Sequence, residues 1–286
     1  MRKIVLVAET GADIPQELAD RYRIHIVPMH VSFGNVTKDD GTFPAEEICR
    51  YYESTGELPK TSGSIPEDFI KAFDVIHSQN PEAQILYLAY SSVTTVSYQS
   101  ALIASEGRDY VTSVDTKSVS AGQCAVVVTM ARLLEEHPEW NMDTAVSAAN
   151  GLIRRAKMAF IPNEMEYLRA GGRVSNAVAL CGKLLGIHPV IEIQDGKLLA
   201  TRKPRGKLST LAPQLVNRYV LDNDLDREEI WLIRTPRMDE NIIISAEEMA
   251  RSLGFRKITW IRTGGVITTH GGPGAFGVAG FSKHSL

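Results

Sequence analysis

The sequence predicts an α/β protein with two domains, and three observations support this. The chain has 286 residues, which is long for one compact core. In its first half, short apolar runs alternate with segments of helical pattern, which favours a parallel sheet covered on both faces by helices. In its second half, two apolar runs are joined by a turn containing Asp195-Gly196, a sequence typical of a β-hairpin. The second sheet should therefore be mixed.

The expected strands are the short runs that are rich in apolar and β-branched residues. In chain order they cover residues 4–7, 25–33, 85–89, 111–114, 158–161, 190–193, 198–200, 230–233, 258–261 and 266–268. Helical patterns lie between most of them, at residues 43–53, 64–80, 120–136, 143–157, 207–223 and 241–253. The helix 64–80 opens on Ser64-Ile65-Pro66-Glu67, which resembles a capping box. We place the domain boundary after the helix 143–157, which gives domains of residues 1–158 and 159–286.

Composition and charge exclude several classes of protein. The formal net charge is -3, whereas nucleic-acid-binding proteins need clustered Lys and Arg for phosphate contacts. No apolar run approaches the roughly 20 residues of a membrane-spanning helix, and no cleavage pattern follows the apolar N-terminus. The three cysteines, Cys49, Cys124 and Cys181, are too far apart for a disulfide framework or a C-x-x-C site. We therefore expect a cytoplasmic protein that binds no nucleic acid and has no transmembrane segment.

Motifs of several enzyme classes are missing from the sequence. The chain has no G-x-G-x-x-G fingerprint, no P-loop, no G-x-S-x-G nucleophile elbow and no H-E-x-x-H zinc pair. Asp39, Asp40 and Asp115 lie near expected loops, but they do not have the spacing of metal ligands. A nicotinamide enzyme, a P-loop ATPase, an α/β-hydrolase and a zinc hydrolase are disfavoured, and we expect neither a cofactor nor a metal.

A run of hydroxyl side chains follows the expected strand 85–89. The stretch YLAYSSVTTVSYQS, residues 87–100, places Ser91 and Ser92 where this strand passes into a helix that is expected to begin between residues 92 and 96. Ligands of open α/β sheets bind at the carboxyl ends of strands, where helix N-termini and hydroxyls can hold an anion. The alternative is that these residues only cap the helix.

Three further side chains have both a binding and a structural interpretation. Thr61 and Ser62 belong to a second hydroxyl group, directly before the helix 64–80, and a cap needs only one of its hydroxyls. Arg173 follows Gly171-Gly172, an ordinary helix stop, and is either exposed or aimed at a ligand. His270 precedes a glycine-rich turn, where an imidazole either packs or handles hydrogen bonds near neutral pH.

Taken together and in this order, these loops resemble the DegV family, bacterial fatty acid-binding proteins that serve fatty acid kinases. The resemblance covers nearly the whole chain. The segments that carry it are Ala12-Asp13-Ile14-Pro15, Val27-Pro28-Met29, Pro59-Lys60-Thr61-Ser62, Ser91-Ser92, Tyr98-Gln99-Ser100-Ala101, Ser113-Val114-Asp115, Tyr167-Leu168, Gly171-Gly172-Arg173, Leu184-Leu185-Gly186-Ile187 with Pro189, Asp195-Gly196-Lys197, and His270 with Gly272-Pro273-Gly274.

The resemblance implies an N-terminal three-layer α/β/α domain with a mainly parallel sheet and a C-terminal two-layer α/β domain with a mixed sheet. It implies a long-chain fatty acid whose tail lies in an apolar tunnel of the N-terminal domain. The hydroxyls that would hold the carboxylate at the domain interface are Thr61, Ser62, Ser91 and Ser92. Arg173 and His270 would face the head group, and the protein would be a carrier that presents the carboxylate to a separate kinase, not an enzyme.

The resemblance also has departures and leaves alternatives open. Val96 stands where the family usually has glycine, and Ile65 where it tends to have serine, so ligand choice is expected to differ. Arg202 and Arg205 belong to a basic run that either docks the kinase, touches an anionic membrane surface transiently, or is a solvated loop. The alternatives to the carrier are a hydrolase or transferase with a Ser or Thr nucleophile and His270 as base, and a binder of another amphiphile.

Overall fold

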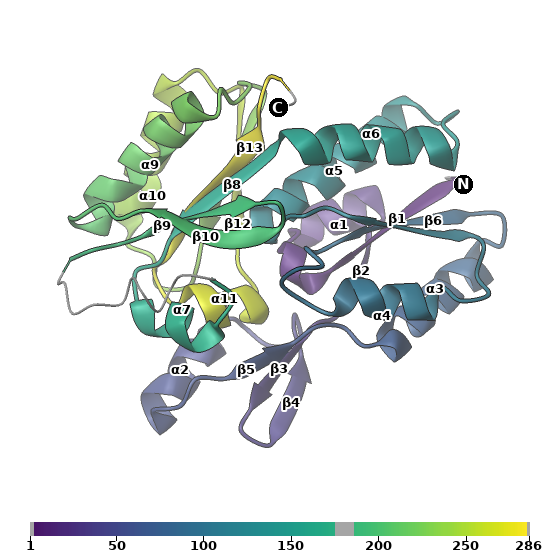
Figure 1. Ribbon diagram of the computed structural model, residues 1–286, viewed down its shortest axis with the longest axis horizontal. Helices are drawn as coiled ribbons and strands as arrows, with labels where there is room; N and C mark the ends of the chain where they lie inside the picture. Colours follow the sequence, from purple (N-terminus) through teal and green to yellow (C-terminus); the bar gives the residue numbers. More distant parts are fainter. Residues whose placement is uncertain (1–2, 175–185, 285–286) are drawn as a thin grey trace.

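The computed structural model describes residues 3–174 and 186–284, and within them the chain forms three β-sheets (Figure 1). Cys181, Leu184 and Leu185 lie outside the described residues. None of the described helices is long and apolar enough to cross a membrane. The first two sheets correspond to the two halves that the sequence predicts.

The first half contains a four-stranded sheet in which all neighbouring strands are parallel, as expected. Its side chains alternate between two apolar clusters: Val7, Ile85 and Tyr87 belong to one, and Leu6 and Leu86 to the other. A parallel sheet that is buried on both faces needs apolar residues at successive positions, which is why its strands read as continuous apolar runs. The strand order is β2 (His25–Val27), β1 (Ile4–Glu9), β6 (Gln84–Ala89) and β7 (Val111–Asp115).

Helices cover both faces of this sheet and complete a three-layer α/β/α arrangement (Figure 1). The helices α3 (Pro66–Gln79) and α4 (Ser97–Ala104) pack on one face through the cluster that contains Phe69 and Phe73. The helices α5 (Ser120–Glu136) and α6 (Met142–Arg155) pack on the other face, and α1 (Gln16–Tyr22) contacts α5. This confirms the fold class expected for the first half.

The second half contains the mixed sheet that the Asp195-Gly196 turn predicts. Both turn residues have positive φ, 46° and 80°, which is the backbone of a tight hairpin turn. The strand order is β10 (Lys197–Arg202), β9 (Val190–Gln194), β8 (Ala156–Ile161), β13 (Phe276–Phe281), β11 (Glu229–Arg234) and β12 (Lys257–Arg262). One face is covered by α9 (Leu208–Asp222) and α10 (Glu240–Ser252), so this half has two layers of its own.

The helix α5 joins the two halves, because it contacts the parallel sheet and also β8, β11 and β13 of the mixed sheet. Most of its residues are buried, including Ala121, Cys124 and Met130. A helix that is apolar around its whole circumference is expected to be enclosed on all sides. The chain passes from α6 directly into β8 at Ala156, so the boundary that we placed at residue 158 falls inside β8.

A third sheet was not expected from the sequence. The run 25–33, which we took for one strand, divides at Pro28-Met29 into β2 of the parallel sheet and β3 (His30–Phe33) of a small antiparallel sheet. Proline lacks the N–H that a strand would donate, which explains the break. The small sheet has the order β4 (Val36–Asp39), β3 and β5 (Lys60–Ser62), and α2 (Glu46–Thr55) lies in the loop between β4 and β5 (Figure 1).

Two local predictions were wrong, and one strand was missed. Residues 266–268 form part of the helix α11 (Gly265–Gly271), not a strand. The glycine-rich turn after His270 is short and leads at once into β13, which lies inside the mixed sheet. Ser64 is not the cap of α3, because its hydroxyl is buried without a partner and the N–H of Ile65 donates to Asp68 at 2.9 Å.

Candidate functional site

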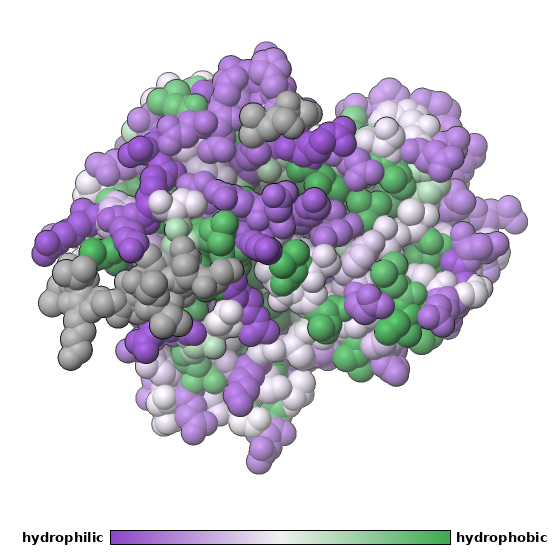
Figure 2. Space-filling view, viewed as in Figure 1, coloured by the Kyte–Doolittle hydropathy of each residue, from purple (hydrophilic) through white to green (hydrophobic). Residues whose placement is uncertain are grey.

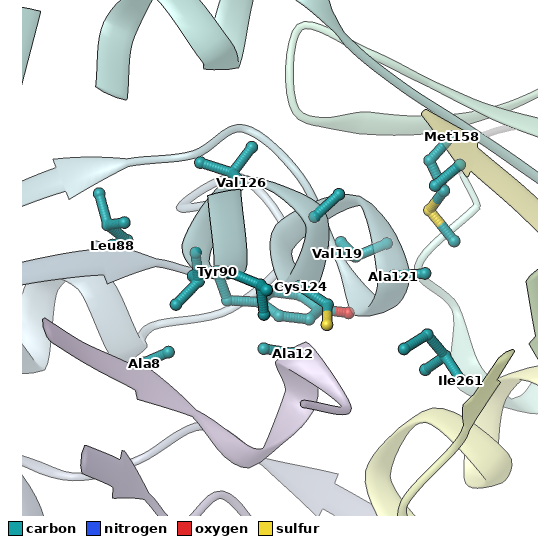
Figure 3. Close-up of a cluster of buried hydrophobic side chains, with 14 of the residues drawn as sticks. Ala8, Ala12, Leu88, Tyr90, Val119, Ala121, Cys124, Val126, Met158 and Ile261 are labelled. Carbon is teal, nitrogen blue, oxygen red and sulfur yellow. The ribbon is translucent and has the colours of Figure 1, made fainter. Parts of the chain in front are cut away.

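An apolar cavity lies between the parallel sheet and the mixed sheet. Its empty volume, which includes the open solvent at its mouth, is about 780 Å³. Tyr90, Val119 and Met158 belong to its lining and to the buried cluster around the start of α5 (Figure 3). The other apolar lining residues come mostly from the mixed sheet and α11 and are Met29, Phe160, Leu198, Ile233, Val266, Ile267, Ala275 and Phe276.

Polar side chains gather in one part of this lining, where three separate segments meet. Thr61 comes from β5, which pairs with β3, and His270 comes from the last turn of α11. The Thr61 Oγ1 and His270 Nε2 atoms share a hydrogen bond of 2.8 Å. Arg173 and Ser62 line the same cavity. The structure therefore brings together four of the residues that the sequence singled out.

His270 is held tightly and stays neutral at neutral pH. Its Nδ1 atom is buried without a hydrogen-bond partner among the described residues. A Cβ at Gly171 would lie 2.2 Å from this atom, so only glycine lets α7 (Met165–Gly171) pack against the imidazole. Burial, and then the positive charge of Arg173, lower the pKa of His270 to about 4. The imidazole can thus exchange hydrogen bonds with a ligand without carrying charge.

Arg173 supplies a positive charge beside the cavity. It follows the left-handed Gly172 (φ 62°) at the end of α7, and its Nη1 donates to the carbonyl oxygen of Gly171 at 2.7 Å. Among the described residues no carboxylate pairs with its guanidinium. An anionic ligand would therefore meet no competing partner there.

The hydroxyl run at residues 91–97 divides into two functions. Ser91 donates to the carbonyl oxygen of Gly196 at 2.8 Å, and Ser92 donates to Asp115 Oδ2 at 2.6 Å. Neither residue lines the cavity. Their hydroxyls anchor the loop to the β9–β10 hairpin and to the end of β7.

The hydroxyls that do line the cavity from this run belong to Thr94 and Thr95. A Cβ at Gly63 would lie 2.4 Å from Thr95 Oγ1, so this glycine lets the segment after β5 approach the loop closely. Both threonines stand in the hydroxyl run that the sequence analysis singled out, but the pattern did not indicate which residues of the run line the cavity.

Ser120 is a lining residue that the sequence reasoning missed. It is the first residue of α5, with a φ of 44°, and its hydroxyl donates to Asp13 Oδ2 at 2.5 Å. Asp13 also accepts from the N–H of Gly264 at 2.7 Å, and burial raises its pKa well above the ordinary value. The only sequence signal for Ser120 was its position between a strand and a long helix.

The described residues contain no group of three or more His, Cys, Asp or Glu that could hold a metal ion.

The comparisons with known proteins identify the family of this chain. The family model for DegV, whose members are described as uncharacterised proteins, matches residues 3–283. The chain belongs to the DegV family. A DegV domain-containing protein of Caldanaerobacter subterraneus subsp. tengcongensis is 26% identical over 288 residues, which are 97% of this chain and 98% of that protein. A fatty acid-binding protein of Thermotoga maritima is 27% identical over 295 residues, 96% of each chain.

Solved DegV structures share the whole fold. A DegV family protein from Thermus thermophilus, described by its fatty acid binding, superposes with a TM-score of 0.87 at 28% identity and covers 99% of this chain and 100% of its own. A DegV lipid-binding protein from Thermotoga maritima superposes with a TM-score of 0.84 at 25% identity, again over 99% and 100%. The arrangement of two sheets around a shared helix is therefore that of the DegV family.

Two positions at which this DegV chain departs from the family pattern lie outside the cavity lining. Val96 and Ile65 are 65% and 46% exposed, before α4 and α3 respectively. Further exposed apolar residues, Val75, Leu102 and Ile103, lie on the same two helices, where Figure 2 shows apolar surface over α4.

The two arginines of the expected docking run differ in their surroundings. Arg202 is partly buried and pairs with Glu192 at 3.0 Å and with Asp222 at 3.1 Å. Arg205 is exposed, and its side chain has no ion pair with a described residue. Of the two, Arg205 is the one that is available to a partner.

Proposed function

We propose that the protein binds a long-chain fatty acid in the interdomain cavity, with the carboxylate beside Thr61, Arg173 and His270. The observation that carries this proposal is an apolar cavity whose polar groups gather in one part and include Arg173, which makes no ion pair with a described residue. An amphiphile with one anionic end matches that distribution. The fatty acid binding described for the relatives from Thermus thermophilus and Thermotoga maritima supports the same ligand class.

The tail would supply most of the affinity and the head group most of the orientation. Burial of each methylene contributes about 0.8 kcal/mol, whereas a neutral hydrogen bond contributes about 1 kcal/mol net. A long acyl chain has many methylenes and only one carboxylate. Hydroxyls at the head would thus select the direction of binding.

Within this proposal, Thr61, Ser62, Thr94 and Thr95 contact the carboxylate. Ser91 and Ser92, which we expected in that role, act through the loop that they anchor, because neither residue lines the cavity. Arg173 stabilises the negative charge from the exposed side.

We further propose that the bound carboxylate is presented to a separate fatty acid kinase, with Arg205 as part of the docking surface. A carboxylate oxygen would form the new P–O bond with the γ-phosphorus of a nucleoside triphosphate, and the nucleoside diphosphate would leave. Hydroxyls and a neutral imidazole leave the carboxylate oxygen more nucleophilic than a buried ion pair would. Arg173 would then face the phosphoryl group that arrives. The cytoplasm, where such a kinase would work, remains the expected location.

An enzyme with Thr61 as nucleophile and His270 as base is the second candidate, and the hydrogen bond of 2.8 Å between them favours it. Two features weaken it. His270 Nδ1 has no orienting carboxylate among the described residues, and a base whose pKa is about 4 accepts a proton poorly at pH 7. Hydrolysis of an acyl ester that His270→Ala abolishes would favour the enzyme.

Native mass spectrometry of the gently purified protein, followed by calorimetric titration with palmitate, tests the fatty acid proposal. We expect a co-purified fatty acid, and roughly fivefold to tenfold weaker binding in Thr61→Val. Thr37→Val, which removes the same hydroxyl from an exposed position of β4 outside the cavity, is the matched control and should bind within about twofold of the wild-type protein. A protein that carries no fatty acid and binds none would overturn the proposal.

A further inference from the structure

Two arginines stand side by side at the carboxyl ends of neighbouring parallel strands. Arg234 is the last residue of β11 and Arg262 the last residue of β12, and the two are register partners. Partners in a parallel pair project from the same face of the sheet. Like charges placed directly across a strand pair are destabilising. We propose that these two arginines bind a phosphate dianion at a site distinct from the acyl cavity.

The two guanidinium groups have no carboxylate partner. Among the described residues, neither Arg234 nor Arg262 makes an ion pair, whereas Arg132, Arg155 and Arg237 each do. Burial, and then the charge of Arg262, lower the pKa of Arg234, although Glu240 acts in the opposite direction. The pair therefore carries positive charge that its own surroundings do not fully compensate.

Both arginines line an open cleft. On one side the cleft is lined by Thr263 and Gly264, the first residues of the loop after β12. On the other side it is lined by Pro236 and Arg237, in the loop after β11. Thr263 lines the acyl cavity as well, so it stands in the wall between the two sites. Neither arginine lines the acyl cavity.

The carboxyl groups of the cleft do not neutralise the positive charge of Arg234 and Arg262. Asp13 and Asp40 accept from the N–H groups of Gly264 and Gly265, each at 2.7 Å. Burial raises the pKa of both carboxyls, and among the described residues no ion pair joins either of them to Arg234 or Arg262. The remaining acids of the cleft are exposed, so solvent screens them: Glu17, Glu46 and Glu240.

The helix that follows β11 begins at the cleft, with Asp239 as its N-cap and Glu240 in its first turn, so the two arginines themselves supply the positive charge. The loop after Arg234 leads to α10, which has 13 residues and whose first turn lies at the cleft through Glu240 and Ile243. Ligands of α/β sheets bind where carboxyl ends of strands meet helix N-termini. Two planar guanidinium groups present paired N–H donors that match the oxygens of a phosphate. The class of ligand is therefore a phosphate group with two negative charges, either free or part of an ester.

Thermal unfolding of the full chain with inorganic phosphate, at constant ionic strength with chloride as the reference anion, tests the site. We expect phosphate to raise the Tm of the wild-type protein, because it binds the folded state. Without phosphate, Arg262→Gln should have a higher Tm than the wild-type protein, since it removes the repulsion. With phosphate, its Tm should rise far less, with binding weakened by at least about tenfold.

Arg256→Gln is the matched control. Arg256 is exposed and directly precedes β12, and its substitution changes the net charge by the same amount. Its response to phosphate should equal that of the wild-type protein. Arg262 is exposed, so its variant is expected to fold even if Arg234→Gln does not. A wild-type Tm that ignores phosphate, or an Arg262→Gln variant that responds fully, overturns the proposal.

Two further probes distinguish the source of the phosphate. Glycerol 3-phosphate that competes with inorganic phosphate in the titration supports a soluble ester. Co-sedimentation with phosphatidylcholine vesicles only when they contain phosphatidic acid, lost in Arg262→Gln and kept in Arg256→Gln, supports a lipid headgroup. If neither probe depends on Arg262 but the response to inorganic phosphate does, free phosphate is the ligand; if the response to inorganic phosphate does not depend on Arg262 either, the site is overturned.

Discussion

His270 joins segments that lie far apart in the sequence, and its protonation is tied to the folded state. Its Nε2 atom shares a hydrogen bond with Thr61, and its Nδ1 atom is buried against Gly171. Burial and the charge of Arg173 hold its pKa at about 4, below the ordinary 6.5. On acidification the unfolded chain therefore takes up a proton before the folded chain does.

This pKa predicts a loss of stability on mild acidification. As the pH falls from 6.5 to about 4, the free energy of unfolding of the wild-type protein should fall by about 3 kcal/mol relative to His270→Gln. Urea unfolding at several pH values in this window measures the difference. Above pH 6.5 the two proteins should respond to pH alike, because the imidazole is neutral in both states. Curves that stay parallel down to pH 4 would contradict the prediction.

The residues of the head-group end were only partly predictable from the sequence. Thr61, Arg173 and His270 carry polar groups next to glycine-rich or loop segments, and the fold brings them to one cavity. The direction of Ser91 was not predictable, because its acceptor is a carbonyl of the hairpin turn, Gly196, which is 105 residues away. No local pattern encodes a contact of that kind. Its result is that Thr94 and Thr95, not Ser91 and Ser92, line the cavity.

At the scale of elements, prediction followed the strength of the periodic pattern. The expected helix 120–136 coincides with α5, because a long and mostly apolar segment has few alternatives. The strand β13 was missed because its sequence, FGVAGF, contains Gly277 and Gly280, and glycine is uncommon inside strands. Its neighbours explain the glycine: a Cβ at Gly277 would lie 2.8 Å from Ile233 Cδ1 and 3.0 Å from the Ala159 carbonyl oxygen.

A crowded glycine, Gly277, and an uncrowded one, Gly151, should respond in opposite ways to substitution by alanine. Gly277→Ala should lower the free energy of unfolding by about 1–3 kcal/mol, because the added methyl has to push buried neighbours apart. Gly151→Ala, on α6, meets no atom within 4 Å and should raise it by about 0.5–1 kcal/mol through helix propensity. Urea unfolding of both variants measures this. A Gly277→Ala protein as stable as the wild-type protein would show that β13 tolerates a side chain there.

At the scale of the whole molecule, one apolar cluster runs through both halves. It includes Leu88 of the parallel sheet, Cys124 and Val126 of α5, and Met158 and Ile261 of the mixed sheet (Figure 3). The interdomain cavity opens within this shared region, so its shape depends on how the two sheets sit against α5. The sequence predicted both sheets, but not that a single helix serves as a layer for each.

A polar contact also joins α5 to the mixed sheet: Arg132 of α5 forms an ion pair with Glu229 of β11. Burial favours the neutral acid, but hydrogen bonds from Arg132, Thr259 and Lys257 hold the pKa of Glu229 below its ordinary 4.5. The pair therefore stabilises the fold above pH 4.5, and this contribution disappears as the pH falls through the lowered pKa.

Arg132→Met should lower the free energy of unfolding at pH 7 by about 2 kcal/mol. This is less than the ~3–5 kcal/mol usual for breaking a buried pair, because Lys257 and Thr259 still contact Glu229. Arg108→Met is the matched control: it breaks a pair with Asp74, whose side chain is 55% exposed, and should cost less than about 1 kcal/mol. Urea unfolding should show one transition in both variants, since α5 packs on both sheets. Equal losses in the two variants, or a second transition in the control, would contradict a joint that depends on Arg132.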